Sequence, residues 1–323
     1  MQILRETHID FLRWRWHAIA LSLAVILSGF GALYARGGLP LGIDFSGGTI
    51  VVLKFEQPTS EQQVRGALGS VPGEKVVQQY GQAGAHEILV RLPELVAEEG
   101  TSLEQGATRI LETLQGGSLG SFEVISTEIV GPVIGRDLQR KGIYATLASL
   151  VGILLYIAFR FRFSFAVGAV VATLHDVIVT IGFLTFFGYE LSLNVVAALL
   201  AITGYSVNDT IVVFDRVREN FRVLRRDALS TVVNTSVNQT LSRTIITSGT
   251  TFLAVLSLYL FGGEVLHGFA FTMLVGIVTG TYSTVFIAAA IAIFMSERSS
   301  RARTASATAE VRARKGNRKA RAS

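Results

Sequence analysis

Apolar residues gather in six stretches that are long enough to cross a membrane, over residues 17–35, 142–159, 163–187, 193–214, 244–261 and 269–295. A membrane-spanning helix needs about 20 mostly apolar residues, so the pattern predicts six spans. The first stretch could alternatively be a signal peptide. No small-residue cleavage site of the A-x-A kind follows it, and the pattern favours an uncleaved anchor.

Lysine and arginine residues are distributed in a way that predicts the orientation of the spans. They gather before span one, between spans two and three, between spans four and five, and after span six. If six spans alternate, all four segments lie on one side, which the positive-inside rule makes cytoplasmic. We therefore expect both termini in the cytoplasm.

Residues 36–138 alternate between strand and helix patterns and carry more acidic than basic residues. Strands are predicted over 49–55, 75–80, 87–92 and 121–130, with helices over about 60–68 and 102–114. The order βαββαβ is typical of a ferredoxin-like domain. The predicted fold is therefore membrane α-helical, with six transmembrane helices and an inserted ferredoxin-like α+β domain in the periplasm.

Two further segments are predicted on the cytoplasmic side, beyond the short N-terminus of residues 1–16. Residues 139–295 contain the predicted spans two to six, and the segment 215–240 between spans four and five is amphipathic. It begins with arginines around an apolar face formed by Val217, Phe221, Leu224 and Ala228. That face predicts a helix lying on the inner leaflet, with a solvated loop as the alternative. The basic tail, 296–323, has no apolar periodicity and is predicted to be disordered; it either attracts anionic lipid or RNA or has no partner.

Composition limits the chemistry that the chain can perform. Half of the residues are hydrophobic and only 16% are charged, as expected of a membrane protein rather than a soluble domain. No cysteine is present, which excludes disulfides and cysteine-ligated metals. Phosphate-binding, dinucleotide-binding, zinc-protease and serine-hydrolase motifs are also missing. We expect no enzyme activity, no catalytic or metal-binding residues, and no cofactor other than the proton introduced below.

Charged and polar residues interrupt the apolar spans at specific places. On helical geometry, Asp209 lies on a polar stripe of span four with Tyr205 and Asn194. A stripe of span five contains Gln239, Arg243, Thr247, Thr250 and Ser257, and a weaker stripe of span six contains Thr272, Gly276, Thr279, Gly280 and Ser283. Spans four and five run in opposite directions, which places Asp209 and Arg243 at similar depth and makes a facing pair sterically feasible.

A mid-membrane charge costs about 2.5–3.5 kcal/mol on insertion scales, so two such residues need an explanation. One reading is a static ion pair that joins two helices. The other is a proton site, at which Asp209 and Arg243 approach and separate as a proton binds and leaves. We predict proton coupling by this pair, with the other polar residues as relay or support: Tyr205, Ser206, Asn208, His175, Asp176, Gln239 and Thr247. For His175 and Asp176, a helix-packing hydrogen bond is the alternative.

Five sequence blocks resemble the signature motifs of the SecD/SecF family, in particular its SecF branch. They are GIDFSGGT (42–49), EIVGPVIG (128–135), GYSVNDTIVVFDRVREN (204–220), NQTLSRTIITSGTT (238–251) and FGGEVLHGF with GTYST (261–284). The resemblance runs from span one to span six and omits only the tail.

The resemblance implies a fold and a function. The family belongs to the resistance–nodulation–division superfamily, and SecD and SecF together form a twelve-span unit in the bacterial inner membrane. It implies partnership with SecD, the SecYEG channel, YajC, membrane lipid and a translocating unfolded polypeptide, driven by the proton-motive force. It also implies that Asp209 and Arg243 carry the proton coupling. No sequence-specific nucleic-acid partner is expected.

Two rival functions remain open at the level of sequence. A proton-driven small-molecule exporter of the same superfamily would need larger periplasmic domains than this chain has. A subunit that holds SecD against the channel without moving protons is not excluded by the sequence.

Overall fold

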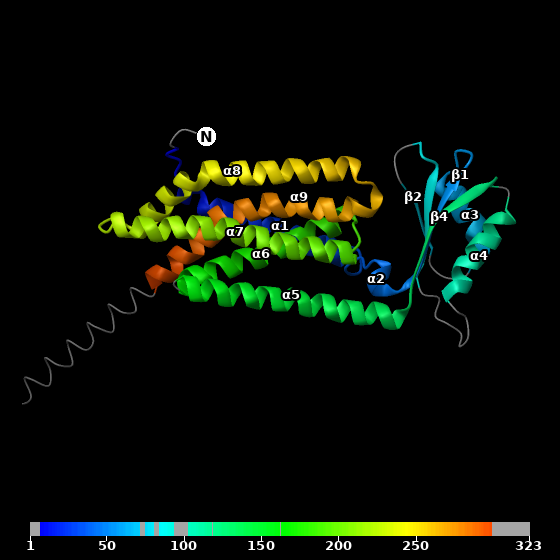
Figure 1. Ribbon diagram of the computed structural model, residues 1–323, viewed down its shortest axis with the longest axis horizontal. Helices are drawn as coiled ribbons and strands as arrows, with labels where there is room; N and C mark the ends of the chain where they lie inside the picture. Colours follow the sequence, from blue (N-terminus) through cyan, green and yellow to red (C-terminus); the bar gives the residue numbers. More distant parts are fainter. Residues whose placement is uncertain are drawn as a thin grey trace, which may run out of the picture.

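The computed structural model describes residues 7–71, 75–80, 84–93, 103–117, 119–161 and 163–298. It has two parts, a bundle of long helices and a small α/β domain at one end of that bundle (Figure 1). We call this end of the bundle the domain end. The opposite end, which holds the turn between α7 and α8, is called the far end.

Six helices of the described chain are long and apolar enough to cross a membrane, which confirms the predicted number. They are α1 (Arg15–Ala35), α5 (Pro132–Arg160), α6 (Phe163–Phe187), α7 (Leu193–Val223), α8 (Leu229–Phe261) and α9 (Glu264–Ser283). A π-helical segment, Thr284–Ala288, follows α9 directly, and the same helix continues to residue 298. A short 3-10 turn, Leu12–Trp14, precedes α1.

The α/β domain has the predicted ferredoxin-like topology. Its elements are β1 (Gly48–Phe55), α3 (Glu61–Ala67), β2 (Val76–Tyr80), β3 (Glu87–Pro93), α4 (Leu103–Gln115) and β4 (Phe122–Val130), with a 3-10 turn over Leu68–Ser70. The sheet order is β2-β3-β1-β4, and every neighbouring pair is antiparallel. This order is the one that a split βαβ motif generates.

The strands of this domain alternate between two environments. Val51, Leu53 and Phe55 of β1 are buried in a core that also contains Val64 of α3 and Ile110 of α4. The two helices therefore cover one face of the sheet, and the other face is turned towards the bundle (Figure 1). Because successive side chains of a strand point to opposite faces, residues between the core positions point towards the membrane helices.

The helix α3 begins where the sequence predicts it. The Ser60 hydroxyl accepts a hydrogen bond from the backbone N–H of Gln63, and the Gln63 side chain accepts one from the backbone N–H of Ser60. This reciprocal capping box satisfies two N–H groups that a helix start would otherwise leave open.

The prediction of a surface helix at the start of the 215–240 segment, over residues 216–229, is wrong. The segment belongs to two long helices: α7 continues to Val223, and α8 begins at Leu229. The apolar face that suggested contact with lipid packs within the protein instead, because Val217 joins a core with Val232 and Val233 of α8. Residues 299–323, most of the predicted disordered tail, lie outside the described residues.

Glycines of α9, Gly276 and Gly280, allow this helix to pack closely against α7. A Cβ added at Gly280 would lie 3.0 Å from the Cβ of Ser206, and one at Gly276 would overlap the Ile202 side chain. The small residues therefore fix how α9 presents its polar side chains to α7.

Candidate functional site

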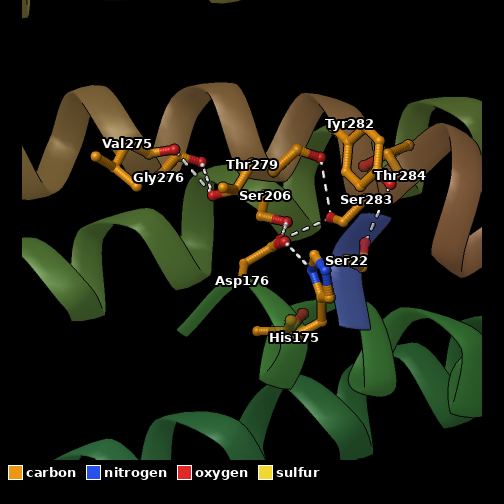
Figure 2. A network of polar contacts seen from close by, with 12 residues as sticks. Ser22, His175, Asp176, Ser206, Val275, Gly276, Thr279, Tyr282, Ser283 and Thr284 are labelled. Atoms are coloured by element: carbon orange, nitrogen blue, oxygen red, sulfur yellow. Dashed lines mark hydrogen bonds and ion pairs between the residues drawn. The ribbon is translucent and has the colours of Figure 1, made fainter. Parts of the chain in front are cut away.

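Asp176 on α6 is the centre of a buried polar cluster, and its side chain is 1% exposed. Its Oδ1 lies 3.0 Å from His175 Nδ1, while its Oδ2 accepts hydrogen bonds from Ser206 Oγ of α7 at 2.5 Å and from Ser283 Oγ of α9 at 2.8 Å. Figure 2 shows how the three helices converge on this one carboxylate. A carboxylate with three partners can hold the helices in register.

The cluster extends along α9 to the point where the α-helix gives way to the π-helical segment. The Tyr282 hydroxyl donates to the backbone carbonyl of Ala18 at 2.6 Å and lies 3.1 Å from Ser22 Oγ, which ties α9 to α1 (Figure 2). Thr284 opens the π-helical segment, and its hydroxyl lies 2.9 Å from that of Thr210 on α7. Single π-helical turns inside α-helices are frequent at functional sites.

Asp209 is the second carboxylate buried among the spans, one turn after Ser206 on α7. It is 7% exposed. Its Oδ1 accepts a hydrogen bond from Thr244 Oγ1 of α8 at 2.6 Å. Its Oδ2 is buried and has no hydrogen-bond partner among the described residues. A buried polar atom without a partner is costly. His175 Nε2, in the cluster around Asp176, is another such atom among the described residues.

Arg243 does not form the predicted pair with Asp209. The two side chains make no ion pair within 4.0 Å in the described structure, although the guanidinium lies close enough to interact electrostatically with the carboxylate. Arg243 is exposed, and the neighbouring residue, Thr244, occupies the inward position.

The predicted polar stripe of span five faces outwards for the same reason. Arg243, Thr247 and Thr250 are exposed, whereas the buried polar side of α8 is formed by Ser236, Thr240, Thr244 and Ser248. The helix has two polar faces, and the one with smaller side chains packs against α7 and α9. Sequence periodicity detects both faces but does not say which is turned inwards.

The remaining predicted residues divide between the site and its surroundings. The Tyr205 hydroxyl donates to Ser248 Oγ at 3.2 Å, and Ser248 lies 2.9 Å from Thr281, so α7, α8 and α9 are joined again. Three others lie away from both carboxylates: Gln239 accepts from Arg216 and Asn220 towards the far end, Thr247 donates to carbonyls of its own helix, and Asn208 is exposed.

Several hydroxyl residues of the site were not predicted as site residues, among them Thr210, Thr244 and Thr284. Each is a small polar residue in an apolar span, a type that also occurs commonly as helix-packing filler, so the type alone is weak evidence. Ser283 appeared only in a weakly polar stripe. No group of three or more His, Cys, Asp or Glu side chains in the described part of the chain is placed to hold a metal ion.

A second set of contacts joins the α/β domain to the bundle. Arg91 lies on β3 between two core positions and points towards the bundle, where its guanidinium forms an ion pair with Glu190 in the turn between α6 and α7. The same guanidinium donates to the Leu41 carbonyl at 2.9 Å and to Ser46 Oγ at 3.3 Å. We call these contacts the domain link.

Burial raises the pKa of the Glu190 carboxyl, and the charge and hydrogen bond of Arg91 act against this by lowering that pKa. The ion pair therefore stabilises the charged form of a carboxyl that its surroundings disfavour.

The GIDFSGGT block completes the connection to α7. It forms a short helical turn, α2 (Ile43–Ser46), and the Asp44 carboxylate accepts a hydrogen bond from the backbone N–H of Leu193, the first residue of α7, at 2.8 Å. A carboxylate at a helix N-terminus is favourably placed. Gly47 and Gly48 have φ values of 74° and 133°, a backbone conformation that glycine adopts readily, and the chain turns into β1 at this point.

Comparisons with known proteins agree on one family. Residues 111–298 match the family model described as "Protein export membrane protein SecD/SecF, C-terminal", and residues 36–59 match the model "SecD/SecF GG Motif". The protein translocase subunit SecF of Desulfurispirillum indicum is 42% identical over 299 residues, which cover 91% of this chain and 94% of that relative. SecF of Escherichia coli O157:H7 is 41% identical, over 88% of this chain and 87% of the relative.

Solved structures of a larger protein, SecDF, are also similar. The crystal structure of SecDF from Thermus thermophilus, titled a translocon-associated membrane protein, matches with a TM-score of 0.78 and 37% identity over 90% of this chain. A SecDF structure in a "super-membrane-facing form" matches with a TM-score of 0.68 and 38% identity over 94% of this chain. The present chain spans 39% and 40% of those two proteins. It belongs to the SecD/SecF family of protein export membrane proteins, and the relatives that it matches over most of their length are SecF subunits.

Proposed function

We propose that this chain is a SecF-type subunit that acts with SecD and uses the proton-motive force to assist the movement of unfolded proteins across the bacterial inner membrane. In this proposal both termini and the far end are cytoplasmic, and the α/β domain is periplasmic. The partners are SecD, the SecYEG channel, YajC and the translocating polypeptide. The proton is the coupling ion.

One observation carries the proposal: Asp209 is buried in a membrane helix with one hydroxyl partner and one unpartnered oxygen. A purely structural carboxylate is expected to resemble Asp176, whose oxygens are both engaged. The free oxygen of Asp209 instead offers a place for a proton, and burial without an ion pair makes the charged form costly.

A cavity of about 740 Å³ lies on the far-end side of Asp209. It is lined mainly by residues of α7 and α8, including Asp215, Arg216, Gln239 and Arg243, and it does not include Asp209 itself. Thr244, which holds Asp209, follows Arg243 directly in the chain. The cavity supports proton exchange with the cytoplasmic side.

Protonation of Asp209 changes the contact between α7 and α8. The ionised carboxylate accepts from Thr244 and attracts the Arg243 guanidinium, whereas the neutral acid loses that attraction. In the proposal, proton binding releases α8 from α7, and proton loss draws the two helices together. An Asp209–Arg243 pair is then one state of a cycle rather than a permanent ion pair.

The helix α7 carries this change to the α/β domain. Asp209 lies 16 residues after Leu193, which is about 24 Å along a helix that rises 1.5 Å per residue. At Leu193 the helix is held by Asp44, and the adjacent turn is held by Arg91 through Glu190. A shift of α7 along its axis therefore pulls on the domain link.

Exchange of Asp209 for Asn tests the proposal. The variant is expected to assemble with SecD, and protein export into inverted membrane vesicles is expected to lose its stimulation by an imposed proton gradient. Asp137→Asn is the matched control, because Asp137 is an exposed carboxylate of α5 that pairs with Lys141. Full proton-driven stimulation in assembled Asp209→Asn vesicles contradicts the proposal and favours an assembly subunit that moves no protons.

A further inference from the structure

A second cavity, of about 550 Å³, opens at the far end between α5, α6 and α7. It lies where the hairpin between α5 and α6 meets the last turns of α7, close to the ends of the membrane spans. None of its nine lining residues is acidic. We call it the arginine cavity, after the four arginines that line it: Arg160, Arg218, Arg222 and Arg225.

The positive charge of this cavity is only partly neutralised. Arg160 pairs with Asp215 at 2.9 Å. Arg225 donates to the carbonyl of Arg222 at 3.1 Å, which holds its guanidinium without neutralising it. Arg218 and Arg222 make no ion pair within 4.0 Å in the described structure. Arg218 and Arg222 are one turn apart on α7, and Arg225 lies in the turn that follows the helix. All three are exposed and line the same cavity, so they can converge on one anion.

The inner wall of the cavity is apolar and aromatic. Phe165 packs edge-on against Phe214, with ring centroids 4.9 Å apart, and Phe161 and Phe221 extend the same aromatic group. Val217 completes the wall. A free inorganic anion gains no binding free energy from an apolar wall. An anion joined to a hydrocarbon chain gains binding free energy both from the arginines and from the aromatic wall.

Two exposed aromatic residues are close neighbours in the chain of the lining residues Arg160, Phe161 and Phe165. Phe159 and Phe163, on either side of the α5–α6 hairpin, are 96% and 70% exposed. Both belong to membrane helices, so in a bilayer they contact acyl chains. A molecule that enters the cavity can thus leave its tails along this exposed aromatic surface without crossing water.

We infer that the arginine cavity binds the phosphate headgroup of an anionic phospholipid, with the acyl chains running along the aromatic surface. Clusters of arginine at the cytoplasmic ends of membrane helices attract anionic lipids. The phosphate lies between Arg218, Arg222 and Arg225, and the first carbons of the tails lie against Phe165 and Phe221. Such a lipid bridges the α5–α6 hairpin and α7, the helix that carries Asp209.

Native mass spectrometry of the full chain, purified in detergent, tests this site. The probes are phosphatidylglycerol, zwitterionic phosphatidylcholine of the same chain length, and inorganic phosphate. The protein is expected to retain phosphatidylglycerol in preference to phosphatidylcholine, and inorganic phosphate in excess is expected not to displace it. The double variant Arg222→Gln/Arg225→Gln is expected to bind phosphatidylglycerol about tenfold more weakly, or more, since each arginine near an anionic surface contributes separately.

A second double variant, Arg226→Gln/Arg298→Gln, is the matched control. It removes the same charge from exposed residues that do not line the cavity, and it is expected to retain phosphatidylglycerol as the unmodified protein does. Three outcomes overturn the inference: equal retention of the two lipids, equal loss in both double variants, or displacement by inorganic phosphate. The last outcome identifies a general anion site.

Discussion

The domain link makes a quantitative prediction about how the α/β domain is held. Arg91 is 11% exposed and Glu190 is 34% exposed, so the pair is largely but not fully removed from water. Exchange of Arg91 for Met keeps the length and the apolar stem but removes the ion pair and the hydrogen bonds to Leu41 and Ser46.

The expected cost follows from these contacts. Hydrogen bonds to charged groups contribute about 1.5–3 kcal/mol each, and a buried partner left alone adds a penalty. About a third of the Glu190 side chain is exposed to solvent, so water replaces part of the interaction lost with Arg91. We therefore expect Arg91→Met to lower the free energy of unfolding by about 2–3 kcal/mol, and the double-mutant cycle with Glu190→Gln to give a coupling of about 1–2 kcal/mol.

The assay combines thermal unfolding in detergent with a distance measurement. The chain has no cysteine, so spin labels can be placed at Glu112→Cys on α4 and Leu260→Cys on α8. In Arg91→Met the distribution of distances between the labels is expected to broaden. Lys141→Met is the control, since it breaks an exposed pair with Asp137 that contributes about 0–1 kcal/mol. Zero coupling in the cycle together with an unchanged distribution refutes the link.

The same variant has a predicted pH dependence. Burial raises the pKa of Glu190, and Arg91 opposes this, so Arg91→Met raises the pKa further. When the pKa of a carboxyl is higher in the folded than in the unfolded protein, its contribution to stability is fully present at a pH below the unfolded pKa, which is about 4.3 for glutamate. This contribution is lost as the pH rises through the folded pKa. The destabilisation by Arg91→Met is thus expected to be larger at neutral pH than at acid pH, and to lose this dependence when Glu190→Gln is added.

Two further predictions concern helix packing. A Cβ at Gly168 would lie 2.6 Å from the backbone carbonyl oxygen of Ala288, so Gly168→Ala is expected to lower the free energy of unfolding by about 1–3 kcal/mol. A Cβ at Gly152 would meet open space, so Gly152→Ala is expected to be neutral or stabilising. Equal melting temperatures of the two variants contradict this prediction. Ser283→Ala removes one donor from Asp176 and is expected to cost about 1–3 kcal/mol in thermal unfolding, and an unchanged melting temperature speaks against Asp176 as a junction of three helices.

The fold could be predicted from the sequence because its signals are local and repeated. Six apolar stretches and the alternation of apolar residues in the strands each point to a single type of element, and the structure has those elements in that order. The segment over 216–229 was misread because an apolar face on a helix looks the same whether it covers lipid or a neighbouring helix. Only the packing of Val217 against Val232 and Val233 decides between the two.

The partner of Asp209 depends on how far α8 is rotated about its axis. Arg243 and Thr244 are adjacent in the chain, and both are reasonable partners at the same depth. The rotation is determined by packing of the small residues Ser236, Thr240, Thr244 and Ser248 against the neighbouring helices, and periodicity does not report it. The domain link was missed for a different reason: Arg91 and Glu190 are 99 positions apart, one in a strand and the other in a turn.

Infrared spectroscopy of Asp209, in the assembled complex with SecD in lipid vesicles, tests directly whether this residue binds the coupling proton. We expect a protonated-carboxyl C=O band that is absent from Asp209→Asn and that falls and rises as the pH on the far-end side is stepped up and down. A band that Asp209→Asn does not remove, or one that stays constant across the pH range in which export is driven by protons, contradicts the claim that Asp209 binds and releases the coupling proton.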